Sequence, residues 1–489
     1  MFTLRLIVFL VMTAVCFVSS ATAGGPLYKD NIGLPSSWDN STAIDYHPES
    51  GTCGAFSNAE MLAFFETALE VWTDIDEVEL AFNQEDGQIG QVGVDNYDDY
   101  VYLDAASPAA LLTDNINPVL FDDDAEITAE IAGEANQYLV LGFAAPAAFT
   151  SDYTEITDGQ AVINCRCLTD HPSGPCYLDG GQGTVEVSES ELEFTVVHEM
   201  GHFINLDHSI TNDNYYGTAT EGSVVPIMYP VSFEAEGGLS ARTDDIASLA
   251  LIYPSLTDID ESWCLVTGTL LDEDGNEVQC VAVTATASSV VDSSLSVGSV
   301  SGSFAISEDE NSDGDAVDDG ECSEYCGYFE MYLRAGYSYT LETYEIYSGF
   351  TGGSSVGPCI NAQKSVTAEE VTTVDEAQCV AGTTIGLGTF TLTGVSSSGG
   401  GGDDDDDGGG GGGGGGGSIV DDSVENPVGY WDCSLSQVRV PHLGSGRGNV
   451  STTNIFTLLF CVCLSFPVIL FRLNEIFKIA HTHIQRSPR

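Results

Sequence analysis

Three histidines and one glutamate stand at fixed spacing in the segment from His198 to His208, which reads HExxHxxNxxH. On an α-helix, His198 and His202 are four residues apart, so their imidazoles project from the same face. Two such imidazoles can hold one Zn²⁺, and Glu199 lies beside them as a general base. The chain must then leave the helix so that His208 can return to the same ion. Three protein ligands leave a fourth position for water, which is typical of a catalytic zinc site.

This segment resembles the signature of the metzincin clan of zinc peptidases, HExxHxxGxxH. Asn205 stands where the clan has a glycine at a backbone turn with positive φ. Asparagine tolerates left-handed geometry better than other non-glycine residues, so the difference is physically mild. The motif Met-Tyr-Pro begins at Met228, twenty residues after His208. It resembles the methionine turn of the matrixin branch, which implies that Met228 packs beneath the imidazoles without binding the metal.

The matrixin resemblance implies the fold of residues 24–260. Matrixins close their catalytic domain with a helix similar to the segment from Leu239 to Tyr253, in which Thr243 can act as the cap. The resemblance implies an α+β domain, in which a twisted mixed sheet packs against a long helix and the zinc helix. It also implies a protein or peptide substrate that binds in extended form along an edge strand above the zinc.

Local patterns in this region indicate the same elements. Ser57 and Glu60 are spaced as a capping box, and apolar residues at helical spacing follow them. Ser188 to Glu191 is a plausible start for the zinc helix. Three runs are typical of strands: residues 101–103, 138–141 and 161–163.

The N-terminus and the charge limit where the protein works. Residues 1–23 read as a secretory signal peptide, with Arg5, an apolar stretch and the cleavage site Ala21-Thr22-Ala23. Residues 24–430 contain five strong bases against 73 carboxylates. Repulsion of this size disfavours nucleic acids and anionic membranes as partners, whereas a solvated acidic surface suits salty water.

The cysteines agree with export. Four lie in the first domain and six in the following region, and even numbers are expected of a disulfide framework. Metal binding by cysteine is the alternative, although paired CxxC spacing is lacking. Cys53 could also act as an inhibitory thiol, but the even number favours a disulfide there.

Residues 262–395 change in character, since helical periodicity fades and Val, Thr, Ser, Gly and Tyr dominate. Apolar runs at 266–271 and 281–285 flank Asp274-Gly275, which predicts a hairpin. Two further runs, 327–333 and 337–341, follow later. The order resembles the carboxypeptidase regulatory-like domain, which implies an all-β sandwich; an unrelated small sandwich is the alternative.

Two acidic loops could bind Ca²⁺. One spans Asp122 to Glu126. The second contains alternating oxygen ligands with a glycine turn, which suits calcium; its candidate ligands are Asp309, Asn311, Asp313 and Asp315. Gly320 stands where an EF-hand would need a glutamate, so that loop type is not supported. Solvated surface charge is the alternative for both loops.

The C-terminal part changes composition twice. Residues 396–430 are rich in Gly and Asp and predict a flexible linker. Residues 431–489 form a basic tail, in which the apolar run 455–471 is long enough for a short membrane span. The tail would then anchor the protein with its basic end in the cytoplasm. A reading-frame error after the glycine repeat is the alternative.

Together these features predict an exported zinc endopeptidase, outside the cell or at its surface. Zn²⁺ on the three histidines would activate water, and Glu199 would transfer the proton to the leaving amine. The alternative is a catalytically silent surface-binding or adhesion protein on the same scaffold. Matrixins shape their specificity pocket with a Pro-x-Tyr segment, and Pro230-Val231-Ser232 departs from it, so no side-chain preference is implied.

Overall fold

The computed structural model describes residues 24–397 and 436–437. Within the first range it leaves out 31, 86, 88, 103–113, 135, 178–183, 210, 213–214, 217, 219, 234–238, 256–258, 260, 289–291, 304–305, 308–321, 346–363 and 367–368. By its contacts the chain divides into the units Met1–Val440 and Pro441–Arg489, so every described residue lies in the first. The predicted signal peptide and the apolar run 455–471 lie outside the described residues. In the part that is described, no helix is long and apolar enough to cross a membrane.

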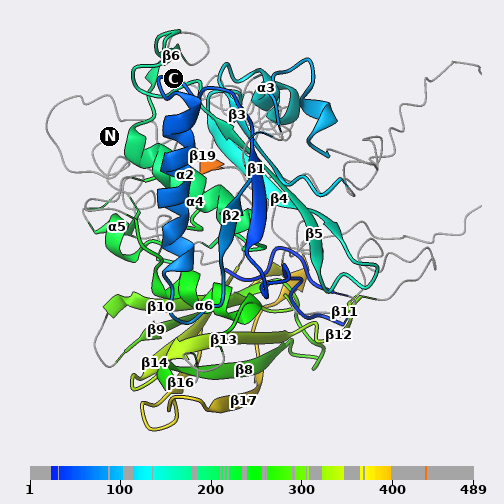
Figure 1. The fold of residues 1–489 in the computed structure, drawn as a ribbon. Coiled ribbons are helices and arrows are strands. Elements are labelled where there is room, and N and C mark those ends of the chain that lie inside the picture. The colour runs from blue at the N-terminus through cyan, green and yellow to red at the C-terminus, as the bar shows by residue number, and fades with distance from the viewer. Residues whose placement is uncertain are drawn as a thin grey trace, which may run out of the picture. The chain divides into compact units, whose positions relative to one another are not determined.

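A six-stranded mixed sheet forms the centre of the N-terminal region (Figure 1). In spatial order the strands are β19 (Ser436–Gln437), β4 (Val140–Phe149), β5 (Ile156–Asn164), β3 (Pro118–Asp122), β1 (Ile44–Pro48) and β2 (Phe82–Gln84). The four strands from β5 to β2 pair in parallel, whereas β4 lies antiparallel to β5. On its other edge β4 pairs antiparallel with β19, from the C-terminal part of the chain.

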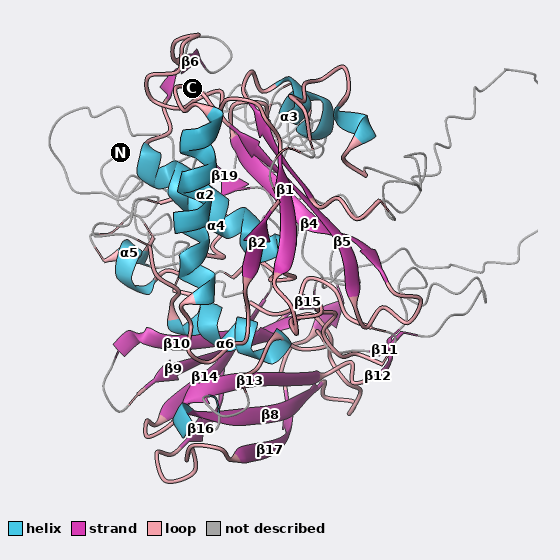
Figure 2. Cartoon of the chain, in the orientation of Figure 1, coloured by secondary structure: helices cyan, strands magenta, loops and turns pink. Residues whose placement is uncertain are grey.

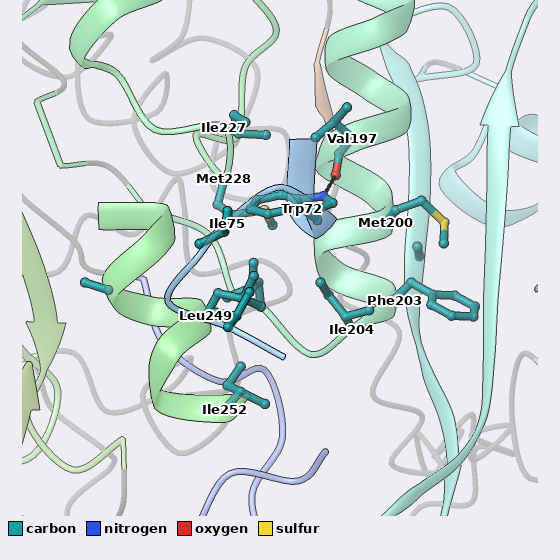
Figure 3. Close-up of a cluster of buried hydrophobic side chains, with 14 of the residues drawn as sticks. Trp72, Ile75, Val197, Met200, Phe203, Ile204, Ile227, Met228, Leu249 and Ile252 are labelled. Carbon is teal, nitrogen blue, oxygen red and sulfur yellow. Dashed lines mark hydrogen bonds between the residues drawn. The ribbon is translucent and has the colours of Figure 1, made fainter. Parts of the chain in front are cut away.

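Two long helices, α2 (Asn58–Thr73) and α4 (Glu189–Phe203), lie side by side against this sheet (Figure 1). Ser57 and Ser188 cap them, and each forms a capping box with the glutamate three residues later. The box at Ser57 and the helix start at Ser188 were both predicted. The Trp72 indole of α2 donates a 2.8 Å hydrogen bond to the Val197 carbonyl of α4. Figure 3 shows this contact inside the cluster that joins α2, α4 and α6 (Thr243–Ile252).

Shorter elements surround this framework. They are η1 (Tyr97–Asp99), α3 (Glu126–Ala132), β6 (Cys176–Tyr177), β7 (Thr184–Val185) and α5 (Glu221–Val224). Disulfides join Cys53 to Cys165 and Cys167 to Cys176, so these thiols are not free to bind a metal or to inhibit.

Three predictions for this region are wrong in detail. The strand predicted at 138–141 begins only at Val140. Val101 and Tyr102 are not in a strand, because β5 already has β3 and β4 on its two edges. Instead, the side-chain amide of Gln160 accepts from Tyr102 N at 2.8 Å and donates to Tyr102 O at 2.9 Å. Thr243 is the first residue of α6 rather than its cap; Arg242 holds the cap position.

The second region consists almost entirely of strands (Figure 2). One sheet has the order β10 (Asp292–Val300), β9 (Val281–Ala287), β14 (Tyr339–Glu345) and β16 (Glu369–Val374). Another has β13 (Tyr328–Arg334), β8 (Trp263–Leu271) and β17 (Thr384–Thr391). Apolar residues of both sheets belong to one buried cluster. Small two-stranded ladders are β11 (Ile306–Ser307) with β12 (Cys322–Glu324), and β15 (Lys364–Ser365) with β18 (Ser396–Ser397).

The predicted hairpin between β8 and β9 forms only around its turn, where Leu271 is bridged antiparallel to Glu277. A tight turn does form, with Gly275 at φ +87° and Asp272 N bonded to Asn276 O at 2.8 Å. After the turn, however, β9 joins the four-stranded sheet, whereas β8 pairs with β13 and β17. A turn signal is local, whereas the choice of partner strand depends on burial across the whole region.

Buried polar contacts join the two regions. Arg334 of β13 forms an ion pair with Glu77 at 2.7 Å, and its guanidinium lies 4.2 Å from the centre of the Trp263 ring. The Trp263 indole donates to the same Glu77 carboxylate at 3.1 Å. The Cys264–Cys379 disulfide closes β8 onto the segment before β17, and Cys280 and Cys326 are also disulfide-bonded.

Candidate metal centre

The three histidines of the sequence motif meet at one point. His198 and His202 come from the last turns of α4, and His208 returns from the segment after it. The Nε2 atom of His198 lies 3.0 Å from that of His202 and 3.3 Å from that of His208. All three side chains are buried, and they form the one group with metal-ligand spacing among the described residues.

Hydrogen bonds from Nδ1 fix the orientation of two of these imidazoles. His198 Nδ1 lies 2.7 Å from the Ile227 carbonyl, and His202 Nδ1 lies 2.7 Å from the Leu206 carbonyl. A carbonyl can only accept, so each Nδ1 carries the proton and each Nε2 presents a lone pair. Lone pairs facing each other at 3.0 Å repel unless a cation lies between them.

A tetrahedral zinc ion fits this arrangement. With Zn–N bonds of about 2.0–2.1 Å, ligand nitrogens are about 3.3 Å apart, close to the two separations above. Burial lowers the pKa of His198 to about 4. Burial, together with the neighbouring imidazoles, lowers the pKa of His202 and His208 well below its ordinary value. Neutral imidazoles are the form that binds a metal.

Glu199 lies against the β4 edge of the sheet. It is fully buried, and a Cβ added to Gly142 of β4 would come within 2.8 Å of its Cγ and 3.0 Å of the Val162 carbonyl. Only a glycine permits so close an approach of backbone and carboxylate side chain. The sequence gives no signal for Gly142, because its contact partner lies far along the chain.

Met228 lies under the helix that carries the histidines. A Cβ on Gly201 would overlap the Met228 sulfur, so the glycine between Met200 and His202 leaves the space that the thioether fills. Figure 3 shows Met228 beside Trp72. The carboxylate of Asp245 on α6 accepts from Ile227 N at 2.9 Å and from Met228 N at 3.1 Å. This anchor holds the Ile227 carbonyl that orients His198.

The backbone leaves α4 at Asn205, whose φ is +76°. The positive φ agrees with the interpretation of this residue as the turn position. Its side chain is also fully buried and makes three hydrogen bonds to the chain near the N-terminus. Sequence reasoning missed this second role, because it treated Asn205 only as a substitute for glycine.

A cluster of aromatic side chains lies against the histidines and includes residues from the segment around Met228. Phe194, one helical turn before His198, stacks on its imidazole with ring centres 5.5 Å apart. Phe233 lies 4.7 Å from Phe194, and both are fully buried. Tyr229 stacks on Tyr216 at 5.0 Å in the same cluster. The helical spacing of Phe194 to His198 could have indicated the first contact.

The acidic loops offer no second centre among the described residues. Asp122 accepts from Ile127 N, Thr128 N and the Thr128 hydroxyl at the start of α3. Asp123 accepts from Gly54 N at 2.6 Å. These carboxylates therefore already bind protein donors. The predicted calcium ligands Asp309, Asn311, Asp313 and Asp315 lie outside the described residues.

Comparisons with known proteins give no family. No family model matches the chain, and no curated protein matches it. Two solved structures of phospholipase PlaB from Legionella pneumophila were found, one of them in complex with thio-NAD. Their TM-scores are 0.15 and 0.14, and each is 10% identical to this chain in sequence. Each match covers 27% of this chain, and it covers 27% of the first PlaB chain and 25% of the second. Similarity this slight carries no argument about fold or activity.

Proposed function

We propose that this protein is an exported zinc-dependent endopeptidase of the metzincin type. The observation that carries the proposal is the convergence of three buried imidazole nitrogens, with Glu199 on the same helix. Three histidines leave an open fourth position, which catalytic zinc sites keep and structural sites do not. The mixed sheet, the two helices and the turn at Met228 are consistent with this class.

Each residue has a role in the proposed hydrolysis. Zinc, when bound, supplies a Lewis acid that polarises the scissile carbonyl and lowers the pKa of water. Glu199 takes the proton from the attacking water and delivers it to the departing amine. The carbonyls of Ile227 and Leu206 hold His198 and His202 in the tautomer that presents Nε2.

An extended substrate suits the edge of β4. Ser436–Gln437 pair antiparallel with Val140 and Gly142 along that edge, so its backbone groups accept an added strand. Gly142 adjoins Glu199, so a peptide on this edge would pass beside the base. Addition of a strand gives affinity through main-chain hydrogen bonds and is tolerant of sequence.

The disulfides support export. The described cysteines of the first domain are all paired, and such pairing is favoured in oxidising compartments. Substrates would then be proteins or peptides outside the cytoplasm. The two-sheet arrangement of residues 263–397 supports an accessory β-sandwich, which we propose without assigning it a ligand.

Hydrolysis of casein or gelatin tests the proposal. The wild-type protein should cleave either one, lose activity in a zinc chelator and regain it when zinc is added back. A Glu193→Gln variant is a suitable control, because Glu193 is on the same helix but does not belong to the histidine cluster. This variant should remain active. A folded, zinc-loaded protein that cleaves neither would favour the catalytically silent binding protein instead.

A further inference from the structure

The chain near the N-terminus forms part of the frame of the metal centre. Residues 25–28 run antiparallel to residues 205–207, with Pro26 bridged to Leu206. Leu27 N donates to Asn205 O at 2.8 Å, and Asp207 N donates to Gly25 O at 2.9 Å. The paired segment therefore contains the last three residues, 205–207, of the connection between His202 and His208.

The Asn205 side chain fastens this pairing. Its Oδ1 accepts from Tyr28 N at 2.6 Å, and its Nδ2 donates to Tyr28 O at 2.8 Å and to Ser36 O at 2.7 Å. The amide thus uses one acceptor and two donors on backbone groups, and it is fully buried. A glycine could adopt the same positive φ but would remove all three of these hydrogen bonds.

The consequences reach two of the three histidines. Leu206, the next residue, supplies the carbonyl that holds His202 Nδ1 at 2.7 Å. Asp207 then bonds through Oδ1 to His208 N at 2.7 Å. The carbonyls of the last helical residues are also held from elsewhere, since Trp38 Nε1 donates to Phe203 O and Tyr253 Oη donates to Ile204 O. Every carbonyl from 203 to 206 therefore has a named donor, as a buried helix end requires.

We propose that Asn205 is a positioning residue of the metal centre, which couples the docked N-terminal segment, residues 25–28, to the placement of His202 and His208. This inference rests on the proposed zinc site and extends it. The Asn205 side chain supplies three hydrogen bonds that a glycine at this position could not make. Docking of the N-terminal segment would then be a condition for tight metal binding.

The test measures metal binding rather than turnover. Zinc affinity is obtained by competition with a chromophoric chelator, and the visible spectrum of the Co²⁺-substituted protein reports the coordination geometry. Asn205→Gly should weaken zinc binding about 10-fold to 100-fold, the range found when groups that orient metal ligands are removed. The Co²⁺ bands should lose the intensity of a tetrahedral site.

Asn212→Gly is the matched control. Asn212 also has a positive φ, +67°, and its Nδ2 donates to Val224 O and Ser293 O, both at 2.8 Å. The substitution therefore removes partly buried amide contacts at a left-handed position outside the 202–208 connection. It should lower the melting temperature but leave zinc affinity and the Co²⁺ spectrum unchanged.

Asn205→Asp keeps the shape and the acceptor for Tyr28 N but turns an oxygen toward two carbonyls. It should weaken zinc as Asn205→Gly does, and it serves if the glycine variant does not fold. Wild-type zinc affinity in Asn205→Gly or in folded Asn205→Asp would overturn the inference. So would an equal loss of affinity in Asn212→Gly. A wild-type protein that takes no zinc would refute the proposed function itself, and this inference with it.

Discussion

At the scale of single residues, the site combines a pattern that the sequence shows with contacts that it hides. The histidines and Glu199 could be identified from spacing alone, because the helix fixes two ligands on one face. Gly142, Asp245 and Phe233 could not, since each meets the centre through the tertiary fold. Asn205 lies between these cases: its turn geometry follows from residue type, but its three buried hydrogen bonds depend on where residues 28 and 36 come to lie.

Gly142→Ala should separate catalysis from metal binding. The new methyl group would come within 2.8 Å of Glu199 Cγ and 3.0 Å of Val162 O, so the base or the β4 backbone must shift. A shift of about 1 Å at a reacting group costs about 100-fold in rate. We expect kcat/KM on a casein-derived peptide to fall by about that factor, with zinc content unchanged. Full activity in this variant would mean that Glu199 is not the base in this position.

At the scale of elements, local signals predicted where helices begin, whereas they could not predict which strands pair. Ser57 and Ser188 cap α2 and α4 because a capping box needs only residues three apart. The turn at Gly275 also formed, yet β8 and β9 joined different sheets. Each of the two sheets buries one face against the other. Which strand joins which sheet therefore depends on apolar residues far apart in the chain.

The carboxylate of Asp245 on α6 should stabilise the turn at Met228. The buried carboxylate of Asp245 accepts hydrogen bonds from Ile227 N, Met228 N and Arg242 N. Asp245→Asn would point an amide N–H at one or more of these donors. We expect the free energy of unfolding to fall by about 3 kcal/mol, and zinc to bind more weakly because Ile227 O is released from its position. Denaturant titration with and without zinc measures both; an unchanged midpoint would contradict the anchoring role.

At the scale of the whole molecule, the described chain is strongly acidic and closed by disulfides, whereas the C-terminal sequence differs in composition from everything before it. The linker and the basic tail are predictions from composition alone, and they lie almost wholly outside the described residues. Composition could not predict that Ser436–Gln437 pair with β4 at the edge beside Glu199.

Truncation after Ser398 tests whether the proposed peptidase depends on its tail. The proposed zinc ligands, the proposed base and the disulfide-bonded cysteines of both regions all precede that point. We expect a folded protein with kcat/KM at least equal to that of the full chain, since removing Ser436–Gln437 leaves the edge of β4 open to substrate. Loss of activity would mean that the tail belongs to the catalytic structure. Mass spectrometry of the natural protein for peptides from residues 431–489 then decides between a genuine tail and a reading-frame error.

The measurement that tests the central claim most directly is zinc content beside turnover in Glu199→Gln. The substitution removes the general base and its charge but leaves His198, His202 and His208 in place. We predict about one zinc per chain in both proteins, and turnover of a peptide substrate reduced by several orders of magnitude in the variant. Retention of more than about a tenth of wild-type turnover, with zinc bound, would contradict the assignment of Glu199 as the base of a zinc peptidase.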